Sequence, residues 1–179
     1  NAAAAAVNLI DVNNQTSSIS AQVTQSFLAN GIQNGGLLNP ADSLLGDFAI
    51  ATATQDYFFV TGTGALEISG LTAGEGYVFQ LFGTRNTPIF RTTRYTFTGI
   101  GSYVDTLQTS GPDLGGPGYN GNNRTVLTTD TILADPNGII TLDLSIVRGG
   151  FGYLSFMQIE AVGNPQPGNR APLVDAGAN

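Results

Sequence analysis

Short runs of alternating apolar and polar residues, broken at intervals of about ten residues by Gly, Pro, Asn or Asp, fill most of this 179-residue chain. Such alternation places successive side chains on opposite faces of a strand. The runs are also rich in β-branched and aromatic residues, which strands favour. We therefore predict strands over 7–12, 18–23, 48–54, 57–61, 65–69, 77–83, 92–98, 102–108, 124–133, 139–147 and 152–162.

The run 139–147 defines its two faces most clearly. Its apolar face is Ile140, Leu142, Leu144 and Ile146, and its polar face is Thr141, Asp143 and Ser145. The tetrapeptide Asp-Pro-Asn-Gly over 135–138 comes just before it and predicts a tight turn, because Pro presets φ and Gly accepts the left-handed conformation.

Two segments do not read as strands. Asn39 can cap a helix that begins at Pro40, continues over 41–45 and ends at Gly46, so one short helix is expected. The segment 111–123 is too rich in Gly, Pro and Asn for regular structure and predicts a long surface loop. The fold class is therefore all-β, an antiparallel β-sandwich with one short helix.

The chain divides by composition into four parts. We expect a tail over 1–6, a sandwich domain over 7–162 and a Pro/Gly/Asn linker over 163–170. The final part, 171–179, reads as the start of another domain or as a strand for exchange with a neighbour. The stretch 169–177 (NRAPLVDAG) resembles the first strand of a PKD domain, an immunoglobulin-like module, which implies that further domains of the same chain are partners.

The chain contains no Cys, His, Trp or Lys, so all six of its basic residues are Arg. Without Cys or His, the usual zinc, haem and nucleophile–histidine sites are excluded. Without Lys, a Schiff base and a P-loop are excluded as well. The 13 acidic residues are dispersed, and nothing pairs two of them for glycoside hydrolysis. We therefore expect no enzymatic activity.

The net charge of −7 argues against nucleic acid or an anionic membrane as a partner, because both require a basic surface. No run approaches the ~18 apolar residues of a membrane span, so membrane insertion is not expected. The lack of Lys and Cys beside abundant Thr, Asn and Gly fits an extracellular bacterial protein, secreted or held at the cell surface.

Four stretches carry a family resemblance: LEISGL over 66–71, GYVFQLFGTR over 76–85, RTTRYTFTG over 91–99 and FGYLSFMQIEAV over 151–162. Together they resemble a galactose-binding-like jelly-roll β-sandwich module found beside catalytic domains in polysaccharide-degrading bacterial exoproteins. The resemblance implies a carbohydrate-binding or spacer domain with a structural calcium ion. Such modules often carry a Trp near their start, whereas this chain has Phe27 at the comparable place.

Sugar binding needs an aromatic face to stack on the ring and fixed polar groups to bind the hydroxyls. Phe90, Tyr119 and Phe151 lie in predicted loops and are the candidate platforms, with Asn122 as a polar candidate in the same long loop as Tyr119. Packing in the fold is the alternative for each aromatic residue.

Three of the six arginines, Arg85, Arg91 and Arg94, fall within ten residues. A planar guanidinium can hold a carboxylate or sulfate group in bidentate geometry, so these residues are candidates for binding an acidic polysaccharide. The alternative is that they pair with acids of the chain, such as Asp56, Glu67 or Asp105. On the strand 92–98, Arg94 shares a face with Thr96 and Thr98.

A metal ion in this chain would need oxygen ligands, which favours calcium. Asp42, Asp47 and Glu160 are the candidate ligands, and solvated acidic side chains are the alternative.

Two functions fit these observations. The first is a non-catalytic extracellular module that binds polysaccharide, and the arginine cluster favours it. The second is a structural or adhesive tile of a surface fibre that self-assembles by strand addition. Low charge and the absence of Lys suit close protein packing, and the missing Trp favours this second hypothesis.

Overall fold

The computed structural model describes residues 5–30 and 34–163, and strands dominate this part of the chain. The largest sheet has six strands in the order β1-β2-β5-β11-β7-β8, and all neighbours are antiparallel. These strands are β1 (Val7–Ile10), β2 (Thr16–Gln25), β5 (Thr63–Ser69), β11 (Ile140–Arg148), β7 (Arg91–Gly99) and β8 (Gly101–Ser110).

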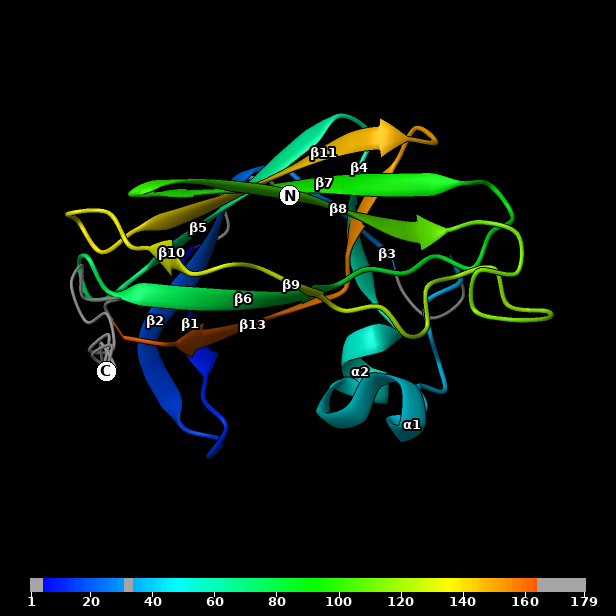
Figure 1. Cartoon of the computed structure of the whole chain (residues 1–179), viewed down its shortest axis with the longest axis horizontal. Helices are drawn as coiled ribbons and strands as arrows, with labels where there is room; N and C mark the ends of the chain where they lie inside the picture. The colour runs from blue at the N-terminus through cyan, green and yellow to red at the C-terminus, as the bar shows by residue number, and fades with distance from the viewer. Residues whose placement is uncertain (1–4, 31–33, 164–179) are drawn as a thin grey trace, which may run out of the picture.

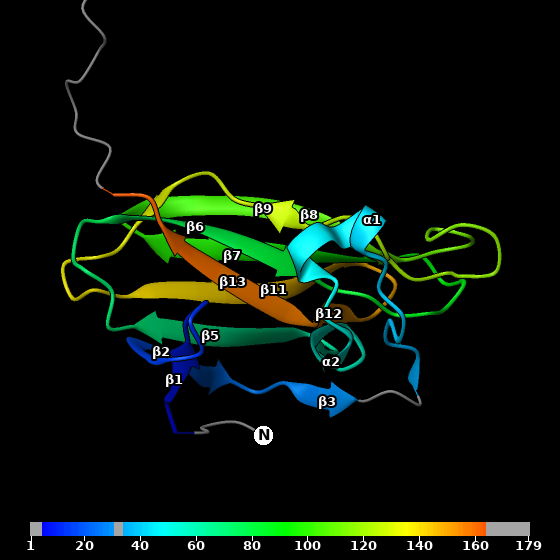
Figure 2. The same ribbon diagram turned by 90° about the horizontal axis from the view of Figure 1, so that it is seen from below.

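Two smaller sheets complete the fold. In one, β6 (Gly76–Phe82) pairs with β13 (Phe156–Ala161), β10 (Ile132–Leu133) and β9 (Leu127–Thr128). In the other, β4 (Tyr57–Val60) lies between β12 (Gly152–Leu154) and β3 (Leu28–Asn30). Figure 1 shows β6 and β13 running beneath β7 and β8, and Figure 2 shows the same two layers from below. The predicted antiparallel β-sandwich is confirmed.

The core fills the space between the two layers. Phe79 of β6 and Phe97 of β7 meet across it with ring centroids 4.6 Å apart. On β11, Ile140, Leu142 and Leu144 are fully buried and Ile146 packs against the core, whereas Asp143 is exposed. The two faces predicted for this strand are therefore confirmed. Phe27 is also buried, and it lies edge-on to Phe58.

The helical content differs from the prediction in two places. The first helix begins at Asp42 and not at Pro40, and its N-cap is Ala41, without a side-chain cap, and not Asn39. Besides α1 (Asp42–Leu45), the chain forms a 3-10 turn, η2 (Gly46–Phe48), and a second helix, α2 (Ala51–Thr54), where a strand over 48–54 was predicted. Over 51–54 the residues are only Ala and Thr, so this half of the run has no large side chain to bury on one face. The backbone N–H groups of this segment form helical hydrogen bonds instead. The Thr54 hydroxyl donates to the Leu37 carbonyl inside the protein. Among the described residues, no helix is long and apolar enough to cross a membrane.

Two predicted strands are each divided in the structure. The run 152–162 forms β12 and β13, which belong to different sheets, and Ser155 between them donates its backbone N–H to the Phe82 carbonyl. The run 124–133 forms only β9 and β10. The long loop over 111–123 forms no helix or strand, as predicted. Residues 1–4 of the predicted tail, 164–170 of the linker and the PKD-like start at 171–179 lie outside the described residues.

The predicted turn before β11 is confirmed and depends on one carboxylate. Asp135 Oδ1 accepts the backbone N–H groups of Asn137 and Ile139, both at 2.8 Å, and Gly138 has φ 71°. These bonds, led by that from Ile139, lower the pKa of Asp135 below its ordinary value. The charged form is therefore favoured in the folded state.

We expect Asp135→Asn to lower the Tm at neutral pH, because the amide oxygen accepts these bonds without a charge. A lowered folded-state pKa gives stability that is present above the unfolded value of about 3.9 and is lost as the pH falls through the folded value. The difference in Tm from wild type should therefore shrink below about pH 4, measured by thermal unfolding across pH. Asp143→Asn, on an exposed outward-facing position, is the matched control. A Tm difference that stays constant with pH would contradict this explanation.

Candidate functional site

A pocket of about 220 Å³ lies against the three-stranded sheet, where the start of β7 reaches it. It is lined by two arginines, one amide and four aromatic residues: Arg85, Arg91, Asn30, Tyr57, Phe59, Phe151 and Tyr153. We call it the arginine pocket.

The aromatic wall follows from the register of short strands. Tyr153 of β12 lies opposite Phe59 of β4, and Tyr57 lies opposite Asn30 of β3. Residues two apart share a face, so Tyr57 joins Phe59, and Phe151 joins Tyr153. The rings of Tyr57 and Tyr153 meet edge to face with centroids 5.1 Å apart. Thr93 fixes this wall to β7 by accepting the Tyr153 backbone N–H at 2.8 Å.

A two-glycine turn brings Phe151 to the pocket. Gly149 and Gly150 have φ of 86° and 76°, backbone angles that residues other than Gly rarely adopt. A Cβ atom at Gly149 would also lie 2.2 Å from the Phe90 carbonyl oxygen. The turn therefore depends on Gly149, and it places Phe151 beside Arg91.

Arg91 has a buried hydrogen-bond donor that no protein group uses. Its Nη1 donates to the Tyr153 hydroxyl, and its guanidinium carbon lies 4.4 Å from the Phe151 ring centroid. Its Nε is buried and has no hydrogen-bond partner. Burial lowers the pKa of Arg91, and the nearby charge of Arg85 lowers it further. A buried donor without a partner is costly, so this nitrogen is available to a ligand.

Arg85 is held beside the same wall. Its Nη1 donates to the hydroxyl of Tyr57, and its guanidinium carbon lies 5.9 Å from the Tyr57 ring centroid. The Tyr57 hydroxyl in turn donates to the Asn34 carbonyl at 2.9 Å. Burial raises the pKa of Tyr57, which keeps this hydroxyl neutral and able to donate. Arg85 is therefore oriented by a neutral partner beside the pocket.

The acids of the described residues do not neutralise the charges of these two arginines. Within residues 5–30 and 34–163, no carboxylate forms an ion pair with Arg85 or Arg91. Asp105 instead accepts from the Tyr103 hydroxyl and the Thr106 backbone. Two guanidinium groups beside one pocket, with no acid of the described residues paired to them, form a candidate site for a carboxylate or sulfate group.

The other predicted ligand residues lie apart from the pocket. Arg94 is exposed on the opposite face of β7, because residues at even and odd positions of a strand point to opposite sides. Phe90 is exposed and stacks under Arg148, whose guanidinium carbon lies 4.4 Å from the ring centroid. The hydroxyl of the half-buried Tyr119 lies 3.2 Å from that of Thr84.

Asn122 is 2% exposed, and its amide is used within the protein. Its Nδ2 donates to the Gly83 and Thr125 carbonyls, and its Oδ1 accepts two backbone N–H groups. Its role in the structure is to hold the end of the long loop against β6.

The three candidate calcium ligands lie on separate elements: Asp42 on α1, Asp47 on η2 and Glu160 on β13. In the described ranges, no three acidic side chains come together in a group that could hold a metal ion. A calcium ion held by backbone carbonyls and one or two of these acids stays a prediction.

Sequence reasoning missed four lining residues: Asn30, Tyr57, Phe59 and Tyr153. One signal for them was present. Tyr57, Phe58 and Phe59 are consecutive, so both faces of this strand carry aromatic rings and only one face can meet the main core. The other face is then a candidate for contact with a ligand.

No protein-family model matches the chain, and no curated protein is similar to it. Several solved structures are similar. The ANX1 ectodomain from Arabidopsis thaliana has TM-score 0.44 and 11% identity, over 91% of this chain and 57% of that one. CBM35 from Cellvibrio japonicus Abf62 has TM-score 0.35 and 17% identity, over 79% and 97%. TmCBM61, in complex with beta-1,4-galactotriose, has TM-score 0.36 and 12% identity, over 75% and 88%.

The similar structures include carbohydrate-binding modules and also an enzyme, an exo-beta-1,3-galactanase, of which this chain spans 33%. All of these TM-scores are below 0.5, so no ligand or activity is carried over from these proteins to this chain. The ligand proposed below is therefore inferred from the residues of the arginine pocket alone.

Proposed function

We propose that this chain is a non-catalytic module of a larger secreted or surface protein, and that it binds acidic polysaccharide in the arginine pocket. The observation that carries the proposal is the buried, unpartnered Nε of Arg91 beside Arg85. A sugar carboxylate or sulfate would accept from both guanidinium groups and satisfy that donor.

The other lining residues of the arginine pocket suit the apolar faces and hydroxyl groups of a sugar ring. Phe59 and Phe151 are half-buried and offer apolar faces to the C–H groups of a ring. The Asn30 Nδ2 can donate to a sugar hydroxyl, while its Oδ1 accepts from Asn34 Nδ2. The seven lining residues include no acid, so the arginine pocket holds no pair of carboxylates for glycoside hydrolysis.

The test is calorimetric titration with uronic-acid oligosaccharides and with neutral oligosaccharides of the same length. We expect binding of the acidic series only. The affinity should fall with rising salt and should fall again below about pH 4, where a ligand carboxyl group becomes protonated. Equal affinity for the neutral series would overturn the proposal.

A second candidate function is self-assembly as a structural tile. The edge strands of the largest sheet, β1 and β8, expose Val7, Ile10 and Val104 at 65%, 59% and 53%. Open edges with apolar side chains favour pairing with another strand. Sedimentation over a wide concentration range tests this function, and a monomer at every concentration would exclude it.

A further inference from the structure

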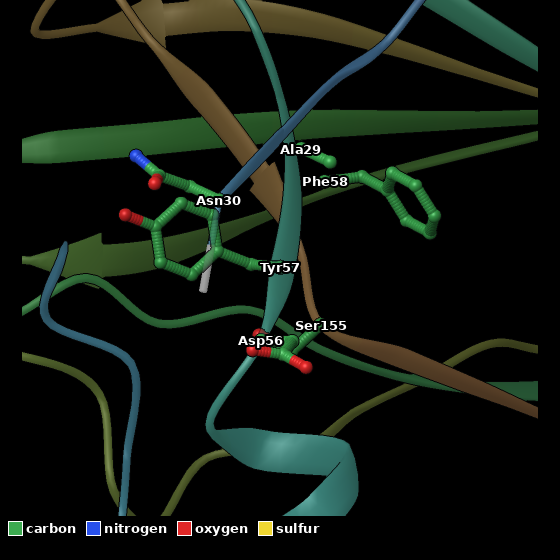
Figure 3. Close-up of a pocket in the computed structure, with 6 residues that line it drawn as sticks. All are labelled: Ala29, Asn30, Asp56, Tyr57, Phe58 and Ser155. Atoms are coloured by element: carbon green, nitrogen blue, oxygen red, sulfur yellow. The ribbon is translucent and has the colours of Figure 1, made fainter. Parts of the chain in front are cut away.

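A second pocket of about 460 Å³ adjoins the arginine pocket. Figure 3 shows the residues that line it: Ala29, Asn30, Asp56, Tyr57, Phe58 and Ser155. We call it the Asp56 pocket. Asn30 and Tyr57 line both pockets and face each other in the β3–β4 ladder. The two pockets are therefore neighbours that share one wall.

The polar groups of the Asp56 pocket differ in charge from those of its neighbour. Ser155 Oγ is buried and has no hydrogen-bond partner, so it can still donate and accept. The Asp56 carboxylate accepts hydrogen bonds, and the Asn30 Nδ2 can donate one, while Asn30 Oδ1 accepts from Asn34 Nδ2. The lining contains no cation. A carboxylate there attracts hydroxyl donors and repels a second carboxylate.

The apolar part of the lining includes an exposed aromatic ring on which a sugar could stack. Phe58 is 48% exposed, and Figure 3 shows its ring on the opposite side of β4 from the ring of Tyr57. A lining that combines an exposed ring with hydroxyl and carboxylate groups matches the mixed surface of an uncharged sugar, which has apolar C–H faces and hydroxyl edges.

We propose that the Asp56 pocket binds a neutral sugar unit linked to the acidic unit in the arginine pocket. This inference rests on the proposed function and narrows its substrate class. The preferred ligand is a polysaccharide in which a uronic acid is joined to an uncharged sugar, and not a chain of uronic acids alone. Arg85 and Arg91 attract the acidic unit to one pocket, and Asp56 repels a second carboxylate from the other, so the two pockets together favour the mixed ligand.

The experiment compares three probes by calorimetry: glucuronic acid, glucuronic acid linked to galactose, and digalacturonic acid. We expect the mixed disaccharide to bind about tenfold more tightly than glucuronic acid, the gain from one or two net hydrogen bonds. Digalacturonic acid should show no such gain, because its second carboxylate would face Asp56.

Two variants test the residues. Ser155→Ala should abolish most of the tenfold gain in affinity for the mixed disaccharide. Asp56→Asn should also reduce it and should raise the affinity for digalacturonic acid relative to wild type. Asp143→Asn removes an exposed acid on the outer face of the large sheet and should leave the order of the three probes unchanged.

The outcomes separate the two proposals. If wild type binds none of the three probes, the proposed function fails. If it binds glucuronic acid and both disaccharides with equal affinity, the arginine pocket stands and the neutral-sugar pocket is refuted. A preference for digalacturonic acid over the mixed disaccharide would likewise overturn this inference alone.

Discussion

Replacement of Arg91 by Ala is expected to weaken the binding of acidic oligosaccharides by roughly 10- to 100-fold, as loss of a charge-assisted hydrogen bond implies. Arg91 carries the unpartnered donor and lies against Phe151, so truncation removes both the charge and the group that supports the ring. The measurement is the change in Kd by calorimetry, with thermal unfolding to verify that the variant is folded.

Two further variants make this prediction specific. Arg91→Lys keeps the positive charge without the planar fork of donors, so its affinity should lie between those of wild type and Arg91→Ala. Arg94→Ala removes a cation from the same strand on its opposite face, and its affinity should equal that of wild type. Similar losses in Arg91→Ala and Arg94→Ala would indicate a general charge effect and would refute the arginine pocket.

The largest effect on stability is expected from Phe97→Ala. Phe97 is fully buried on β7 and packs against Phe79 of the opposite layer with ring centroids 4.6 Å apart. Truncating such a ring removes buried apolar surface and leaves a cavity, which costs about 3–5 kcal/mol. For a domain of this size, that loss lowers the Tm by about 10 °C.

Denaturant unfolding measures the loss, with the slope m unchanged if the denatured state is unaffected. Thr98→Ala, at the adjacent exposed position of β7, is the control and should change the free energy of unfolding by less than about 0.5 kcal/mol. A loss below about 1 kcal/mol for Phe97→Ala would show that the two layers do not pack as described.

The sequence predicted strands well where large apolar residues alternate with polar ones. The run 139–147 is such a case, because its four aliphatic side chains can be buried only if the segment is extended. The run 48–54 alternates as well, but after Phe48 and Ile50 it holds only Ala and Thr, which offer little surface to bury, so local helical hydrogen bonds determine the structure over 51–54. A periodic pattern is therefore informative in proportion to the size of the side chains that form it.

The candidate site was only partly predictable. The scarcity of cations drew attention to Arg85 and Arg91, and the structure places both in one pocket. Their partners are distant in the sequence: Tyr57 lies 28 residues from Arg85, and Tyr153 lies 62 residues from Arg91. Which strands pair is a long-range property that local patterns do not contain. Arg94 was grouped with the other two by its spacing, but it lies on the opposite face of β7 from Arg91.

The unpartnered nitrogen of Arg91 implies opposite selective pressures on one side chain. In the free protein it lowers stability, because a buried donor has lost its water without gaining a partner. If an acidic ligand binds as proposed, the same donor gains its partner, and this cost is removed. An apolar residue at position 91 would remove this unpartnered donor, but it would also lose the hydrogen bond to Tyr153 and the contact with Phe151. Without a ligand, selection would therefore act against the Nε donor and in favour of the rest of the same side chain.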